Sequence, residues 1–122
     1  MERIEEFSLE GKSFVYLDLS GVKTNNEFLR VVDIWKQVIK KYPENSIYTV
    51  TNVSDIRADS ETKKMLTDLM AHNKPYVKNA AAIGFDGIKK IMANTISKGA
   101  GRPSIHFALT KEKAIEWLLS QE

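Results

Sequence analysis

The chain has 122 residues, 43% hydrophobic and 28% charged, which predicts a single compact domain over residues 1–122. Eighteen basic and 16 acidic side chains leave a net charge of +2, too small for the basic surface of a domain that binds nucleic acid, so no nucleic-acid partner is expected. The chain has no cysteine, which excludes disulfides, thiolate metal sites and a cysteine nucleophile.

The segments that direct proteins to membranes are not seen in the sequence. Residues Met1–Glu6 lack the apolar core of a secretory signal. No later apolar run approaches the roughly 18 residues that span a bilayer. We therefore expect a cytoplasmic protein without a transmembrane segment.

The chain begins with a hairpin pattern. Ile4–Phe7 followed by Gly11 predicts an edge strand and a tight turn. The apolar, β-favouring run Phe14–Leu19 then predicts a buried strand, which ends at Ser20.

A long helix is predicted next. Apolar residues recur at i, i+3, i+4 and i+7 between Phe28 and Tyr42. Thr24, Asn25 or Asn26 can cap the start of this helix, and the proline after Tyr42 stops it.

Strand and helix patterns alternate through the rest of the chain. Ser46–Val53 predicts a strand, and Asp59 with Ser60 caps a helix whose apolar face runs from Met65 to Met70. The later elements are a strand at Ala80–Phe85, a helix at Ile88–Ile96, a strand at Ser104–Leu109 and a helix that opens at Thr110.

This order predicts an α/β fold with a mostly parallel central sheet of about five strands, four helices and a β-hairpin at its start. Binding sites in such sheets lie at the carboxyl ends of the strands. The segments predicted there are residues 20–26, 54–60, 85–87 and 110–112.

No pattern specific to catalysis is found. The glycines lack the spacing of a phosphate-binding loop, and His72 and His106 have no partner at metal-ligand spacing. No cofactor, metal or catalytic residue is therefore predicted. An enzyme would require His106 to converge with the aspartates near the strand ends, which capping explains more simply. These aspartates are Asp18, Asp55, Asp59 and Asp86.

A second set of residues is apolar. Leu29 and Ile34 fall off the main stripe of the first long helix and widen its apolar surface. Together with Trp35 and Met70 they form a candidate surface for an apolar ligand or for a homodimer. A homodimer through the first edge strand is a further alternative.

Three segments carry a family resemblance. Tyr16–Gly21, Val53–Ser60 and Ala80–Gly84, taken with the order of the elements, resemble the small STAS domains typified by the bacterial anti-sigma-factor antagonists. The chain looks closest to the compact STAS/SEC14-like branch, and the resemblance covers most of the chain. It implies a non-enzymatic regulatory or protein-interaction module with a protein partner. The alternative is a lipid or other apolar-ligand binder of the SEC14-like type.

The resemblance also points to a switch loop. In the antagonists an Asp-Ser-Ser-Gly motif opens a helix, and its second serine is phosphorylated. Asp59 and Ser60 match the first two positions, while Glu61 stands at the phosphorylated one and carries a single charge. Ser60 is left as a phosphorylation site or a capping residue. The resulting set of interaction residues is Ser54, Asp55, Arg57, Asp59, Ser60 and Glu61.

Overall fold

The computed structural model describes residues 3–57, 59–84, 98 and 105–121. Five strands form one sheet in the order β1-β2-β3-β4-β5. β1 pairs antiparallel with β2, and the remaining neighbours are parallel. The strands are β1 (Ile4–Leu9), β2 (Lys12–Asp18), β3 (Ile47–Asn52), β4 (Val77–Ile83) and β5 (His106–Ala108).

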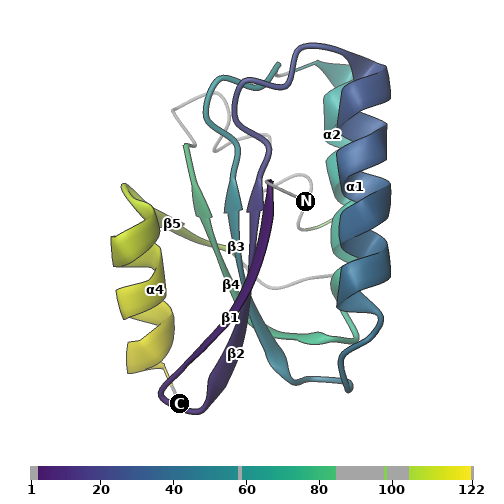
Figure 1. Cartoon of the computed structure of the whole chain (residues 1–122). Coiled ribbons are helices and arrows are strands. Elements are labelled where there is room, and N and C mark those ends of the chain that lie inside the picture. Colours follow the sequence, from purple (N-terminus) through teal and green to yellow (C-terminus); the bar gives the residue numbers. More distant parts are fainter. Residues whose placement is uncertain (1–2, 58, 85–97, 99–104, 122) are drawn as a thin grey trace.

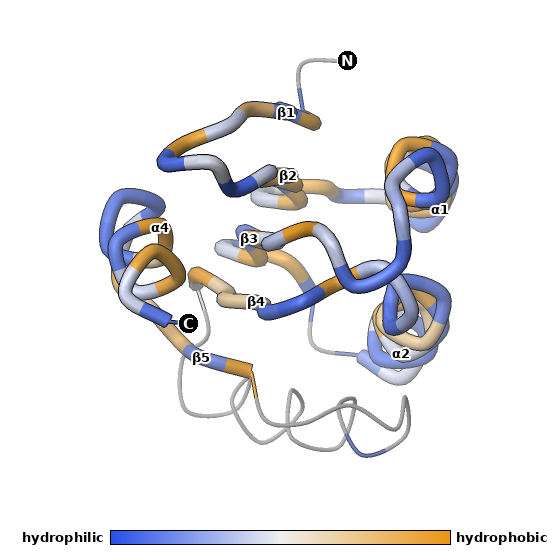
Figure 2. Tube along the Cα trace, turned by 90° about the horizontal axis from the view of Figure 1, so that it is seen from below, coloured by the Kyte–Doolittle hydropathy of each residue, from blue (hydrophilic) through white to orange (hydrophobic). Residues whose placement is uncertain are grey.

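The described helices cover both faces of this sheet. They are α1 (Asn25–Ile39), α2 (Ser60–Asn73) and α4 (Lys111–Ser120). α1 and α2 lie side by side on one face, and α4 lies on the other (Figures 1 and 2). Because β2 to β5 are parallel, their carboxyl ends meet at one edge of the sheet, at the top of Figure 1. We call it the carboxyl edge.

Each described helix begins at a side chain that accepts a hydrogen bond from its first turn. Thr24 accepts from the Glu27 amide at 3.1 Å, and Asp59 accepts from the Thr62 amide at 2.8 Å. Thr110 caps α4 in the same way, at 3.1 Å. These caps fix where α1 and α2 leave the carboxyl edge.

The alternation of side chains along the strands divides the core into two layers. Val15 and Leu17 of β2 pack toward α1 and α2, where they meet Trp35 and Leu69. Phe14 of the same strand belongs to the layer under α4. The other buried residues of that second layer are Tyr48, Val50, Ala81, Ile83, Ala114 and Leu118.

The predicted fold class is confirmed: the sheet is mostly parallel, has five strands and begins with a hairpin. Three of the four predicted helices lie in the described part of the chain. The helix predicted at Ile88–Ile96 falls outside the described residues.

Two boundaries lie three residues from their predicted positions, and several strand ends shift by one or two residues. α1 ends at Ile39, short of Tyr42, because the Lys41 and Tyr42 amides donate in tighter turns to the carbonyls of Val38 and Ile39. Pro43 has no amide hydrogen with which to continue the helix. β4 begins at Val77, three residues before the predicted start at Ala80, because a bulge in the pairing with β3 brings Val77 opposite Ile47.

Candidate functional site

The ends of β2 and β3 carry the same turn. Asp18 is paired with Asn52 in the sheet, and each accepts a hydrogen bond from the backbone amide two residues later. The Ser20 amide donates to Asp18 Oδ1 at 2.9 Å, and the Ser54 amide donates to Asn52 Oδ1 at 3.0 Å. Each turn ends at a residue with left-handed backbone conformation: Gly21 with φ 69° and Asp55 with φ 60°. The two loops therefore leave the sheet in parallel.

The end of β4 packs directly under the second of these loops. Gly84 has φ +90°, and a Cβ atom there would lie 2.5 Å from both the backbone nitrogen and Oγ of Ser54. On the other side the Gly21 amide donates to the Ser54 carbonyl at 3.1 Å. Ser54 is thus held between neighbouring strand ends, and the loop that follows it starts from a fixed position.

Beyond this point four polar side chains join α1 to the start of α2. Arg57 Nη2 donates to Asn25 Oδ1, and Asn25 Nδ2 donates to Glu61 Oε2. Arg57 Nε lies 3.5 Å from Asp59 Oδ2. Together with Ser60 these residues line an open hollow of about 450 Å³ on the surface. We call Asn25, Arg57, Asp59, Ser60 and Glu61 the entrance cluster.

The electrostatics of the entrance cluster favour the ionised form of Asp59. The hydrogen bond from the Thr62 amide, aided by the positive charge of Arg57, holds the pKa of Asp59 below its usual value of 3.8. Arg57 and Asp59 are both nearly half exposed, at 46% and 43%. The cluster therefore presents charged groups to solvent in a fixed arrangement.

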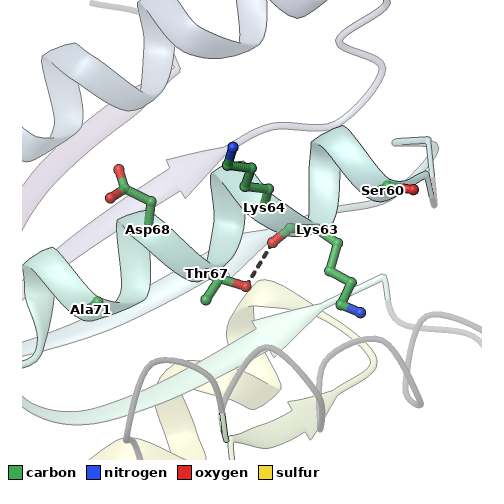
Figure 3. Close-up of a pocket in the computed structure, with 6 residues that line it drawn as sticks. All are labelled: Ser60, Lys63, Lys64, Thr67, Asp68 and Ala71. Atoms are coloured by element: carbon green, nitrogen blue, oxygen red, sulfur yellow. Dashed lines mark hydrogen bonds between the residues drawn. The ribbon is translucent and has the colours of Figure 1, made fainter.

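A second hollow, of about 490 Å³, follows the exposed side of α2 (Figure 3). Ser60 lies at its helix-start end, and Lys63 and Lys64 point away from the helix in different directions. Thr67 Oγ1 donates to the Lys63 carbonyl at 2.8 Å. Asp68 is paired with Lys36 of α1, which joins the two helices again about two turns after Glu61 in α2.

The structure separates the predicted switch loop into two parts. Ser54 belongs to the packed strand ends, and Asp55 is exposed beyond it. Arg57, Asp59, Ser60 and Glu61 come together around the hollow. Ser60 is exposed as the first residue of α2 and also lines the second hollow, while Asp59 is the cap.

The four residues of the predicted apolar surface have different environments. Leu29 is 44% exposed, whereas Trp35 is buried at 2%. Trp35 Nε1 has no hydrogen-bond partner in the described part of the chain. Ile34 is half-buried. Met70 of α2 is partly buried and packs against the core layer between the sheet and the helices α1 and α2. The apolar-ligand surface and the homodimer stay predictions.

Three of the residues that an enzyme would need have local partners: His106, Asp18 and Asp59. His106 stacks on Trp117 with ring centres 3.9 Å apart, in the layer under α4. Asp18 holds a turn and Asp59 caps a helix. Asp86 lies outside the described residues. Within the described ranges, no group of three or more histidine or acidic side chains is arranged to hold a metal ion.

Sequence reasoning gave two residues a smaller role than the structure does. Asn25 was expected only as one of three candidate caps, and Thr24 is the cap instead. From the sequence, Gly84 belongs to a predicted strand followed by a turn and to a segment that carries the family resemblance, with no contact to Ser54 expected. The repeated spacing of Asp18-Leu19-Ser20 and Asn52-Val53-Ser54 is the signal that could have identified the paired loops.

Comparison with known proteins supports the fold. No family model and no curated protein matches the chain. The chain is similar to the crystal structure of an uncharacterised protein of the DUF3478 family from Shewanella loihica PV-4, described as having a SpoIIAA-like fold. The TM-score is 0.70 at 13% identity, covering 94% of this chain and 91% of the other. The SpoIIAA-like, or STAS-like, fold predicted from the sequence is thereby confirmed.

None of the helices in the described ranges combines the length and the hydropathy required of a membrane-spanning segment.

Proposed function

We propose that the protein is a non-enzymatic interaction module that binds a partner protein through the entrance cluster. The observation that carries this proposal is a hydrogen-bonded bridge of polar side chains around one open hollow, which links Asn25 of α1 to the charged and exposed residues of the β3–α2 loop and α2. Fixed, exposed charges favour recognition because little side-chain freedom is lost on binding.

The anchoring of the loop supports the same role. Ser54 is fixed by Gly21 and Gly84, so the residues that follow it extend from a rigid support. The carboxylates of Asp18 and Asp59 already accept structural hydrogen bonds, which suits a binding surface better than acid–base chemistry.

Affinity capture with charge-reversal variants tests this proposal. Tagged wild-type protein and the Arg57→Glu and Glu61→Lys variants are each expressed in the native host, purified and compared by quantitative mass spectrometry. Lys41→Glu is the matched control, because Lys41 is also exposed and follows α1 at its opposite end.

The expected result is a protein that the wild type and the Lys41→Glu variant enrich equally and that both entrance-cluster variants lose. Circular dichroism confirms that every variant is folded. A set of bound proteins that is the same for all four folded chains would refute the proposal.

A further inference from the structure

Asn25 has an unusual place in the entrance cluster because the oxygen and the nitrogen of its carboxamide both make hydrogen bonds. Oδ1 accepts from Arg57, which is 32 residues away, and Nδ2 donates to Glu61, which is 36 residues away. A primary amide side chain offers an acceptor oxygen and a donor nitrogen on separate atoms without carrying a charge. Asn25 therefore meets a cation on one side and an anion on the other.

Asn25 thus lies between two opposite charges in a chain of hydrogen bonds. Arg57 lies in the loop before α2 and Glu61 in its first turn, and both are exposed. A guanidinium and a carboxylate that come within reach of each other are frequently paired through two parallel hydrogen bonds. In the described part of the chain the ion pair of Arg57 is made with Asp59, not with Glu61.

We propose that Asn25 is a positioning residue that holds Arg57 and Glu61 apart across the hollow, so that both charges face a binding partner. The inference rests on the proposed function and names the chemistry of the partner: a protein segment that presents one acidic and one basic side chain. The acidic group would meet Arg57 and the basic group Glu61. Without Asn25, the two charges pair with each other.

The test uses the isolated protein and the side-chain Nε–H signal of Arg57 in ¹H–¹⁵N NMR spectra. The Glu61→Gln substitution is introduced into the wild type and into the Asn25→Ala variant. In the wild type Asn25 separates the two side chains, so Glu61→Gln should move the Arg57 signal little. In the Asn25→Ala background Arg57 and Glu61 are in contact, so Glu61→Gln should move it clearly.

The comparison is repeated with Asn25→Ser, because serine is common at helix starts and this variant should fold. Backbone amide spectra confirm that each variant is folded. Equal responses to Glu61→Gln with and without Asn25 would overturn the inference. This outcome is distinct from failure of the proposed function, because no partner is needed to observe it.

Where affinity capture has supplied a partner, Asn25→Ala should weaken its binding at least about fivefold. Asn26→Ala, an exposed neighbour in the same helix turn, is the control and should leave the affinity unchanged. Equal affinities of the wild type and the folded Asn25→Ala variant would contradict the positioning role.

Discussion

Gly84 and Ser54 approach each other so closely that no side chain fits between them. A Cβ atom at position 84 would lie 2.5 Å from the Ser54 backbone nitrogen and 2.7 Å from its Cα atom. The backbone of Gly84 also has φ +90°, which residues other than glycine rarely adopt. This contact joins the end of β4 to the loop that leads to the entrance cluster.

Gly84→Ala should therefore lower the free energy of unfolding by roughly 2–4 kcal/mol, because backbone strain and a steric clash both act. Urea denaturation measures the change. Gly11→Ala is the control: Gly11 has φ +76°, but a Cβ atom there meets nothing within 4 Å. This control should lose about 1–2 kcal/mol from strain alone. Equal losses in the two variants would mean that the close contact with Ser54 has no energetic weight.

Asp59 makes a pH-dependent contribution to stability as the cap of α2. Its pKa is lower in the folded protein than the usual 3.8, chiefly through the hydrogen bond from the Thr62 amide. The contribution is therefore present above the unfolded-state pKa and is lost as the pH falls through the lower folded-state value. Asn can accept the same hydrogen bond without titrating.

The free energy of unfolding is measured by urea denaturation at several pH values from neutral down to about 3. At neutral pH the wild type should be more stable than Asp59→Asn. The difference should shrink as the pH falls below about 4. Asp59→Ala loses the cap itself and should be less stable than Asp59→Asn throughout. A difference between the wild type and Asp59→Asn that does not change with pH would contradict this account.

Tyr42 follows α1 and donates a hydrogen bond to Glu6 of β1 at 2.6 Å. Burial, followed by this hydrogen bond and the negative charge of Glu6, raises the pKa of Tyr42 from 10.0 to about 12. The folded state thus favours the neutral phenol. Its contribution to stability is complete below pH 10.0 and is lost as the pH rises toward about 12.

A titration of tyrosinate absorbance in the wild type should contain a late component that Tyr42→Phe lacks. Glu6→Gln removes the charge but not the burial, so it should move this component to lower pH while leaving it above 10.0. If Tyr42→Phe instead removed a component near the ordinary value, the contact with Glu6 would not persist in solution.

Lys12 stabilises the end of α4 from a distant strand. Its Nζ donates to the carbonyls of Leu119 at 3.2 Å and Gln121 at 2.9 Å, and it lies 5.3 Å from the centre of the Tyr48 ring. A cation at a helix C-terminus is favourable, so Lys12→Met should cost about 0.5–1 kcal/mol in thermal or urea unfolding. Lys113→Met, near the start of the same helix, should cost nothing. A loss for Lys113→Met as large as that for Lys12→Met would argue against this interaction.

The sequence patterns were sufficient to predict the fold because they report local structure. The apolar, β-favouring run at Phe14–Leu19 and the helical spacing after Thr24 depend only on neighbouring residues and on which face is buried. Local patterns do not predict the end of a strand where pairing with a neighbouring strand determines it. Val77 joins β4 through its contact with Ile47, and no local pattern around Val77 records that contact.

The local features of the candidate site were predictable from the sequence, whereas the contacts between distant segments were not. Asp59 is a recognisable cap, and the strand-end rule located its loop correctly at the carboxyl edge. The link from Asn25 to Arg57 and Glu61 depends on how α1 and α2 lie against the sheet, over separations of 32 and 36 residues. The fit of Gly84 against Ser54 likewise depends on the order of the strands.

The most direct test of the account is site-specific photo-cross-linking in the native host. A photoreactive amino acid replaces Ser60, the exposed first residue of α2 in the entrance cluster, and in a parallel strain it replaces the exposed Lys41. Illumination should link position 60 to one defined protein that position 41 does not capture. No adduct at position 60, or the same adducts from both positions, would contradict the claim that the entrance cluster binds a protein partner.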